Sequence, residues 1–271
     1  MNKPERAARR VRYELKFRLL QVSRVQPVTP HLVRVTLSGP DLEGFTSAGY
    51  DDHVKVFFPE PGQEKPVVPQ VGPNGPVFTE DKPRSTARDY TPRRYDATAQ
   101  ELDLEFALHG HGPAAQWAVN AQPGQFLGVG GPRGSFVIDA EFDAYLLVGD
   151  ETALPAIARR LEELPAHAQV VVVAEVAGAD DEQQFQTRAQ VRCVWVHRGD
   201  VDAGDPAALT EAVAALQLPE GDVYAWVAAE SAVAKSVRKN LVDVRGMPKE
   251  WVKAAGYWKR GAAATHDKHD D

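Results

Sequence analysis

The sequence predicts a two-domain α+β protein, in which an antiparallel β-barrel is followed by an open α/β domain built on a parallel sheet. Two observations lead to this prediction. Up to about residue 142, short runs alternate apolar and polar residues and are separated by glycine and proline. From about residue 143, apolar runs alternate with helical patterns. We therefore expect domains over 11–142 and 143–261, with flexible tails at 1–10 and 262–271.

The strands predicted for the first domain show the period-two alternation of a sheet with one buried face. They span residues 13–25, 31–37, 53–58 and 102–108. Residues 59–83 are rich in proline and glycine and predict a long loop. Short alternating strands with frequent turn residues are typical of a barrel or a sandwich, and the barrel is the fold that we expect.

The second domain carries strand-like and helix-like segments in turn. Apolar runs typical of covered parallel strands lie at residues 145–148, 170–174, 191–196 and 223–229. Helical patterns lie at residues 154–164, 207–216 and 233–244. Ser231 is the expected N-cap of the last helix, and Gly246 its expected end. Ligands of such sheets bind at the carboxyl ends of the strands.

Composition indicates a globular protein of the reducing cytoplasm. Of its 271 residues, 43% are hydrophobic and 25% are charged, as in soluble domains. The longest apolar run, 223–229, is far shorter than the roughly 20 residues of a spanning helix, and no apolar block follows the N-terminal arginines. Cys193 is the only cysteine, which excludes an internal disulfide and a cysteine-ligated metal site. We expect neither membrane insertion nor secretion.

Charge is unevenly distributed along the chain, whose formal net charge is −7. Residues 1–25 hold eight basic and two acidic residues, and residues 245–261 hold five basic residues and one acidic residue. A net acidic protein is a poor general ligand of nucleic acid, whereas local basic patches suit a small anion. We therefore expect an anionic small molecule, and no nucleic acid, as a partner.

Residues Arg88-Asp89-Tyr90-Thr91 form the first candidate motif. If this segment is a strand, Arg88 and Tyr90 share one face. A guanidinium beside an aromatic ring suits a phosphate group that adjoins a flat ring system. Taken alone, the pattern also fits a barrel strand with an exposed arginine.

The second candidate motif, His109-Gly110-His111-Gly112-Pro113-Ala114, directly follows a predicted strand. Its glycines let backbone N–H groups approach an anion, and a short helix that starts near Pro113 would direct its positive end there. The segment lacks the Lys-Ser/Thr of a P-loop, and two histidines without further ligands are not a typical metal site. It is a candidate pyrophosphate site.

The third candidate motif, Gly149-Asp150-Glu151-Thr152-Ala153-Leu154-Pro155, lies between a strand and a helix at the expected ligand edge of the sheet. Thr152 and the free N–H groups of the helix could hold a phosphate or a nicotinamide. Asp150 and Glu151 could form an acid–base pair, but we interpret them as residues that complement the helix dipole.

In this order, the three motifs resemble the siderophore-interacting branch of the ferredoxin-reductase-like flavoproteins, which are flavin-dependent ferric-siderophore reductases. Three more segments share the resemblance: Asp52-His53-Val54-Lys55-Val56-Phe57-Phe58-Pro59, Gly131-Pro132-Arg133-Gly134-Ser135 and Gly256-Tyr257-Trp258-Lys259-Arg260-Gly261. The resemblance as a whole covers residues 11–261. The resemblance implies an FAD barrel followed by an NAD(P)H domain, and electrons that pass from NAD(P)H through FAD to siderophore-bound Fe(III), so that Fe(II) is released.

The resemblance also implies roles for the matching residues. Those implied to contact FAD, bound non-covalently, are Arg88, Tyr90, Thr91, His109, Gly110, Gly112, Pro113 and Ala114. Those implied to lie near the junction of flavin and nicotinamide are Thr152 and Ala153. The basic residues implied to attract the anionic iron chelate are Lys55, Arg133 and Arg260, or Lys259 beside it. No catalytic side chain and no metal ligand is implied, because the flavin carries the electron chemistry.

The electron donor stays open between NADH and NADPH. Glu175 ends a predicted strand, and acidic residues follow it at 180–182. An acidic strand end favours the unphosphorylated ribose of NADH, an arginine would favour NADPH, and no arginine is evident there.

Three alternative functions remain. The chain could be a general flavin or ferric-chelate reductase, an electron-transfer protein fed by ferredoxin, or a siderophore-binding module without turnover. We expect a monomer, because nothing in the sequence indicates an obligate partner.

Overall fold

The computed structural model describes residues 8–73, 75–78, 84–108, 112–138, 141–261 and 267–268. The chain forms two compact units, Met1–Glu141 (unit 1) and Phe142–Asp271 (unit 2). The boundary expected from the sequence lies one residue further along. Within the described part, no helix is both long enough and apolar enough to cross a membrane.

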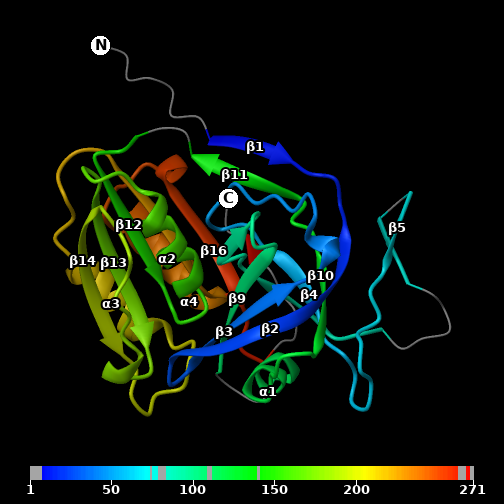
Figure 1. Cartoon of the computed structure of the whole chain (residues 1–271). Coiled ribbons are helices and arrows are strands. Elements are labelled where there is room, and N and C mark those ends of the chain that lie inside the picture. The colour runs from blue at the N-terminus through cyan, green and yellow to red at the C-terminus, as the bar shows by residue number, and fades with distance from the viewer. Residues whose placement is uncertain are drawn as a thin grey trace. The chain divides into compact units, whose positions relative to one another are not determined.

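Unit 1 is built on a seven-stranded antiparallel sheet (Figure 1). Its strands are β2 (Phe17–Thr29), β3 (Leu32–Ser38), β4 (Val54–Phe57), β7 (Ala87–Tyr90), β8 (Arg94–Asp96), β9 (Glu101–Ala107) and β10 (Phe126–Gly130). Their order is β7-β4-β10-β2-β3-β9-β8. The four strands predicted from alternation are β2, β3, β4 and β9, and β2 begins and ends four residues later than expected.

The two edge strands of this sheet are consecutive in the chain. β7 and β8 lie at opposite edges, yet only residues 91–93 separate them. A link of this length spans at most about 14 Å, so the sheet must curve until its edges meet. The rings of Tyr90 on β7 and Phe106 on β9 lie 4.4 Å apart at this seam. The sheet is therefore a barrel that is closed at the seam by chain and side chains, without a ladder of hydrogen bonds.

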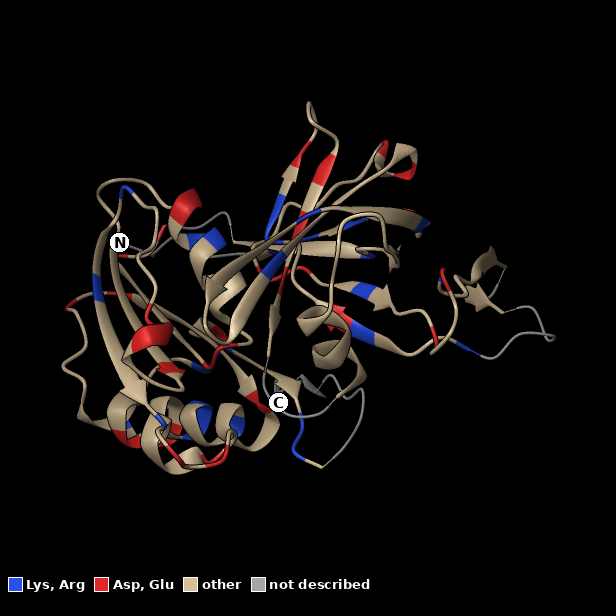
Figure 2. Cartoon of the chain, turned by 60° about the horizontal axis from the view of Figure 1, so that its bottom comes forward, with Lys and Arg blue, Asp and Glu red and all other residues tan. Residues whose placement is uncertain are grey.

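The alternation predicted for the barrel strands separates a core face from an outer face. Val35 on β3 is opposite Leu104 on β9, and both lie in the core. The neighbouring opposite pair, Arg34 and Glu105, forms an ion pair on the other face. Figure 2 shows such charged residues as blue and red segments on the barrel strands. The alternation of the sequence thus separates the two faces of the barrel wall, although Glu105 on the second face is buried as well.

Two segments of unit 1 differ from the prediction. Ala8–Arg12 is a strand, β1, that pairs with β11 (Gly134–Ile138), so the tail expected over 1–10 is wrong for residues 8–10. The pairing was missed because β1 is basic and mostly exposed, with no alternation to reveal it. The predicted loop 59–83 contains a short hairpin, β5 (Gln70–Gly72) and β6 (Gly75–Val77).

Unit 2 is an α/β sheet with the strand order β14-β13-β12-β15-β16-β17. Its strands are β12 (Ala144–Gly149), β13 (Gln169–Val176), β14 (Gln190–His197), β15 (Val223–Glu230), β16 (Val252–Trp258) and β17 (Asp267–Lys268). Its α-helices are α2 (Leu154–Glu163), α3 (Pro206–Ala215) and α4 (Ser231–Lys239). All strands are parallel except β17, which is antiparallel to β16. Figure 1 shows the helices lying along this sheet.

The four strands and three helices predicted for unit 2 are present within two residues of the expected bounds, apart from the last helix. That helix begins at Ser231, and its N-cap is Glu230, whose carboxylate accepts hydrogen bonds from the backbone N of Ala232 and Val233. The assignment of Ser231 as N-cap is therefore wrong. After Lys239 the chain makes a π-helical turn, Asn240–Val244, and stops at Gly246, whose φ is +70°.

The strand order places a crossing point at the centre of the unit 2 sheet. β12 has β13 on one side and β15 on the other, so chain connections diverge from it. In open α/β sheets, ligands bind outside the carboxyl ends of the strands at such a point. We call the carboxyl ends of β12 to β16 the ligand edge. Asp150 and Glu230 lie there, as do Glu175 and Arg198.

Candidate active site

The first candidate motif lies on β7, which pairs with β4, and its side chains alternate between the two faces of the barrel wall. Arg88 is opposite Val56, and Tyr90 is opposite Val54, both of which are fully buried in the core. Opposite residues in an antiparallel pair share a face, so Arg88 and Tyr90 share the core side, as the motif predicted. Lys55 lies on the other face, where its Nζ is 2.7 Å from Oδ1 of Asp89.

Tyr90 belongs to a group of aromatic rings at the seam. Its ring lies 4.4 Å from Phe106 and 6.3 Å from Phe58, and Trp117 packs against both phenylalanines. Burial raises the pKa of the Tyr90 hydroxyl, which stays protonated at neutral pH. In the part of the chain that the structure describes, this hydroxyl makes no hydrogen bond. It is a polar group on the core side of β7 that can receive a ligand.

Trp117 lies on the short helix α1 (Pro113–Val119), which packs Ala114 and Ala118 onto the barrel core. Gly112 is its N-cap, no side chain caps it, and a Cβ at Gly112 would meet nothing within 4 Å. The helix starts at Pro113, as expected. His109, Gly110 and His111, which precede it, lie outside the described residues.

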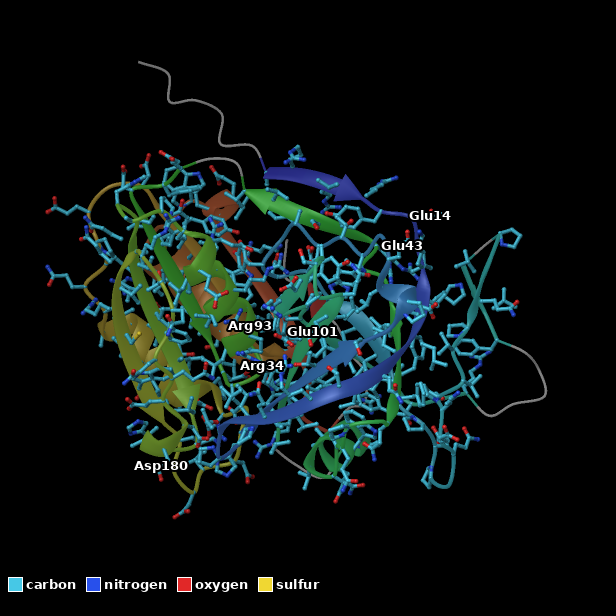
Figure 3. All side chains as sticks on the ribbon, in the orientation of Figure 1. Glu14, Arg34, Glu43, Arg93, Glu101 and Asp180 are labelled. Atoms are coloured by element: carbon cyan, nitrogen blue, oxygen red, sulfur yellow. The ribbon has the colours of Figure 1, made fainter. Side chains whose placement is uncertain are left out.

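The link that closes the seam is anchored by an ion pair that the sequence did not indicate. Arg93 lies 3.7 Å (Nε) from Oε1 of buried Glu105, and Arg34 donates to the same oxygen from Nε at 2.9 Å. Figure 3 labels Arg34 and Arg93. Thr91, buried two residues before Arg93, is thereby held in place. Only the pairing of β3 with β9 brings these charges together, and periodicity alone does not give that register.

The donor set on the core side of β7 fits an anion next to a flat ring. Arg88 donates from Nη1 to its neighbour Ala87 O at 2.7 Å and has no carboxylate partner among the described residues. A half-buried guanidinium without a counter-charge favours an anionic ligand. The hydroxyls of Tyr90 and Thr91 and the uncapped start of α1 add further donors. A dinucleotide with a diphosphate and an aromatic ring system, such as FAD, matches this chemistry.

The two segments that carry Lys55 and Arg133 are joined by a hydrogen bond. Asp52, just before β4, accepts from the hydroxyl of Ser135 at 2.5 Å, and Ser135 lies two residues after Arg133. Tyr13 also contacts the Ser135 hydroxyl, and its backbone N donates to Arg133 O. Burial raises the pKa of the Asp52 carboxyl, and the hydrogen bonds that it accepts from Ser135, Ser47 and the backbone N of Gly49 oppose the rise. The hydrogen bonds of Ser135 and Tyr13 fix the backbone of the segment that carries the exposed Arg133.

In unit 2, neither Asp150 nor Glu151 caps α2 or lies in its first turn, so their interpretation as caps that complement the helix dipole is wrong. The N-cap of α2 is Ala153, without a side-chain cap. Asp150 accepts hydrogen bonds from Thr152, and also from Glu230 and Trp258. The carboxylates bind partners from other strands. These interactions outweigh the attraction of the helix end, which lies three residues away.

Glu151 pairs with an arginine at the ligand edge. Arg198 donates from Nη2 and Nη1 to the two oxygens of Glu151, at 2.7 and 2.9 Å, and from Nη1 to Glu175 at 3.3 Å. The sequence did not reveal an arginine near Glu175, because Arg198 follows the next strand. Parallel strand ends meet at one edge, and that rule could have found it. Burial, together with the charge of Asp150, raises the pKa of Glu175 to about 7.

Acidic residues also bind Arg260, one of the basic residues at the end of β16. The backbone N of Arg260 donates to Oε1 of Glu230 at 3.1 Å, and its guanidinium pairs with exposed Asp202. Lys259 is exposed. The structure thus brings Arg260 and Thr152 onto one hydrogen-bonded network through Glu230 and Asp150. The candidate residues form two groups, one in each unit.

Sequence profiles of known families match both units. Residues 21–136 match the siderophore-interacting FAD-binding domain, and residues 142–261 match the siderophore-interacting protein profile. The NADPH-dependent ferric-chelate reductase of Escherichia coli is 38% identical over 95% of this chain and 99% of its own. The chain belongs to the siderophore-interacting protein family. The ferric vibriobactin reductase ViuB of Vibrio cholerae, 35% identical over 90% of both chains, is another relative.

Solved structures agree with this family assignment. A siderophore utilization protein from T. fusca superposes with a TM-score of 0.89 at 40% identity, over 97% of this chain and all of that chain. A ferredoxin NADP+ reductase from Neisseria gonorrhoeae, with a TM-score of 0.54 at 14% identity over 84% of this chain and 91% of that chain, shares the fold. The predicted fold class, an antiparallel barrel followed by a parallel α/β sheet, is confirmed. The match to the siderophore-interacting FAD-binding domain confirms FAD as the expected cofactor, and the relatives from Escherichia coli and Vibrio cholerae are both named as reductases, one of them as NADPH-dependent.

Proposed function

We propose that this siderophore-interacting protein reduces ferric siderophores in the cytoplasm, as a monomer, with electrons that pass from NAD(P)H through FAD. One NAD(P)H and two Fe(III) chelates give one NAD(P)⁺, two Fe(II) and one proton. Fe(II) is bound weakly by the hard oxygen ligands of a siderophore and leaves. Arg88 carries the proposal: it lies on the core side of β7 with Tyr90 and has no carboxylate partner in the described part of the chain. Relatives named as ferric-chelate and ferric vibriobactin reductases support it.

When bound, FAD supplies the conversion between a two-electron donor and a one-electron acceptor. The chain's own residues bind and orient. Arg88 would pair with the diphosphate, and Tyr90 and Thr91 would lie against the ring system. The start of α1 at Gly112 and Pro113, with Ala114 behind it, would follow the diphosphate, as would His109 and Gly110. In unit 2, Thr152 and Ala153 would hold the nicotinamide.

Exposed cations would attract the iron chelate. Lys55 and Arg260 are paired with Asp89 and Asp202, whereas Arg133 and Lys259 have no ion-pair partner among the described residues. Exposed pairs are weak, so a multiply charged anion can compete with a single carboxylate for each cation. The attraction raises the rate of encounter and falls with salt.

Replacement of Arg88 by alanine is expected to weaken FAD binding by about 10- to 100-fold, because charge-assisted hydrogen bonds are worth about 1.5–3 kcal/mol. Flavin fluorescence during titration of the apoprotein measures the dissociation constant. Arg24→Ala, which removes an exposed arginine that pairs with Glu101 elsewhere on the barrel, is the matched control. Equal FAD affinity in the two variants would exclude Arg88 as a phosphate ligand.

The double variant Lys55→Ala and Arg133→Ala is expected to lower kcat/KM for a ferric chelate about tenfold at low salt and to flatten its dependence on ionic strength. KM for the nicotinamide donor should not change. Stopped-flow reduction of ferric tris(2,3-dihydroxybenzoate) at several salt concentrations is the measurement. A variant as fast and as salt-dependent as the wild type would contradict the role of both cations.

The proposed function is tested first by the visible spectrum of the purified protein. NADH or NADPH is then added without oxygen, followed by the ferric chelate and a ferrous trap. A flavin spectrum that one nucleotide bleaches, with Fe(II) captured after the chelate is added, supports the proposal and selects the donor. A protein that does not take up FAD refutes it. A flavoprotein that neither nucleotide reduces indicates a donor such as ferredoxin, or a binding role.

A further inference from the structure

The carboxylate of Asp150 joins three segments at the ligand edge of unit 2. Its Oδ1 accepts hydrogen bonds from the backbone N of Thr152, at 2.9 Å, and from the Thr152 hydroxyl. Its Oδ2 accepts from the backbone N of Glu230 at 3.0 Å and from the indole Nε1 of Trp258 at 2.8 Å. Asp150 is only 5% exposed, and hydrogen bonds shielded from water hold their geometry more firmly.

The segment that carries Trp258 reaches Asp150 because β16 contains an irregularity. Ala229 is opposite Gly256, but Glu230 is opposite Trp258, so Tyr257 is the extra residue of a bulge. A bulge reverses which face the following side chain takes. A Cβ at Gly256 would lie 2.3 Å from the Ser231 hydroxyl, so only glycine lets β16 approach the start of α4 this closely.

Glu230 extends the connection to the basic residues beyond Trp258. Its backbone N donates to Asp150, and its Oε1 accepts from the backbone N of Arg260 at 3.1 Å. The Ser231 hydroxyl donates to Trp258 O at 3.2 Å. A Cβ at Gly204 would lie 3.0 Å from the Trp258 ring, so the loop before α3 covers that ring. Residues 258–260 are therefore held by side chains and backbone from both sides.

We propose that Asp150 is a positioning residue, which fixes Thr152 and residues 258–260 in one arrangement so that the electron donor and the iron chelate are presented together. This inference rests on the proposed function, in which Thr152 meets the nicotinamide and Arg260 the chelate. Asp150 touches neither ligand. It acts through Thr152 on one side and through Trp258 and Glu230 on the other.

The direction of each hydrogen bond decides what Thr152 can offer to a ligand. The Thr152 hydroxyl gives its proton to Asp150, so it has only lone pairs left for a ligand. It can accept a hydrogen bond from the amide group of a nicotinamide but cannot donate one. An asparagine at 150 presents one NH₂ group to partners that are all donors. Asp150→Asn therefore opposes the donors on one side, offers the donors on the other side only a weaker, uncharged acceptor, and leaves the size of the side chain unchanged.

Four single variants and one double variant of the FAD-loaded protein test the proposal. Asp150→Asn alters the centre of the connection. Trp258→Phe removes the indole N–H together with one ring of the indole and keeps an aromatic side chain. Thr152→Val removes only the hydroxyl. Trp195→Phe is the matched control, because Trp195 on β14 stacks on Phe185 and none of its described contacts reaches this network. Steady-state kinetics with the donor and with ferric tris(2,3-dihydroxybenzoate), together with the indole N–H resonances, are measured for each.

We expect KM for the chelate to rise about fivefold or more in Trp258→Phe, KM for the donor to rise similarly in Thr152→Val, and both to rise in Asp150→Asn. The double variant Asp150→Asn/Trp258→Phe should have the same chelate KM as Asp150→Asn. Both changes break the same hydrogen bond, which joins the indole N–H of Trp258 to residue 150. The Trp258 indole N–H should exchange slowly with solvent in the wild type and at least about tenfold faster in Asp150→Asn.

A merely structural role gives a different result. Partial unfolding lowers kcat with the active fraction and leaves both KM values unchanged, and that outcome would overturn the proposal. Unchanged indole exchange in Asp150→Asn would overturn it too, whatever the kinetics. If wild-type protein reduces no ferric chelate with either nucleotide, the proposed function fails. The indole exchange and the affinity for NAD(P)⁺ in the same variants then still decide whether Asp150 positions Trp258 and Thr152.

Discussion

Replacement of Arg198 by methionine is expected to lower the free energy of unfolding by about 3–5 kcal/mol, because it leaves buried carboxylates without their counter-charge. Arg198 is the only cation that contacts both Glu151 and Glu175 among the described residues, and both carboxylates are almost fully buried. Methionine keeps most of the side-chain length and fills a similar space, so the loss is mainly electrostatic. Urea unfolding at pH 7, followed by circular dichroism, measures the change.

Arg192→Met on the same strand is the control for this experiment. Arg192 is exposed, and its one described side-chain bond, to Gln217 O, is 3.3 Å long. We expect this variant to differ from the wild type by less than about 0.5 kcal/mol. If Arg198→Met is as stable as Arg192→Met, the buried carboxylates of the ligand edge do not need Arg198, and the ion pairs are not what holds β13 and β14 at this edge.

Replacement of Glu175 by glutamine is expected to stabilise the protein at pH 8 and to have little effect at pH 4.5. The folded state raises the pKa of Glu175 from 4.5 to about 7, chiefly through burial. A carboxyl with a raised pKa stabilises the fold in its protonated form. That contribution is fully present below pH 4.5 and is lost as pH rises to about 7. The shift corresponds to about 3 kcal/mol of stability, which the wild type loses over this pH range. Glutamine does not ionise, so the variant does not lose it.

Unfolding by urea between pH 4.5 and pH 8 measures this difference. Wild-type stability should fall relative to Glu175→Gln across that interval, with most of the divergence complete by about pH 7.5. Glu220→Gln, which changes an exposed glutamate in the same unit, controls for the loss of one negative charge. Parallel stability curves for Glu175→Gln and the wild type would show that Glu175 is ionised over the whole range, with Arg198 outweighing burial.

Much of the architecture could be predicted because burial leaves a period in the sequence. The uninterrupted apolar runs of β12, β13 and β15 come from strands covered on both faces, and the alternation of β3 and β9 comes from a barrel wall. β16, with the sequence VKAAGYW, was missed because a lysine and a glycine interrupt its apolar residues, so that it shows no continuous apolar run. β1 was missed because an exposed basic strand has no apolar face.

The candidate site could be predicted only where one segment carries the whole motif. Arg88 and Tyr90 share a face because they are two residues apart on one strand. The contacts of Asp150 with Trp258, and of Glu151 with Arg198, join residues far apart in sequence. They depend on the strand order and on a bulge, which local patterns do not encode. The interpretation of Asp150 and Glu151 as complements of the helix dipole failed because tertiary partners outweighed the local helix end.

The seam of the barrel has a consequence for how the cofactor and the fold depend on each other. Between β7 and the far edge of the sheet, no hydrogen-bond ladder resists opening among the described strands; the link 91–93 and a few rings hold the two sides. A cofactor that binds Arg88 and Tyr90 on one side and the start of α1 on the other would act as a cross-link. Its affinity would add directly to the stability of unit 1, so the flavin-loaded barrel would resist unfolding more than the apoprotein does.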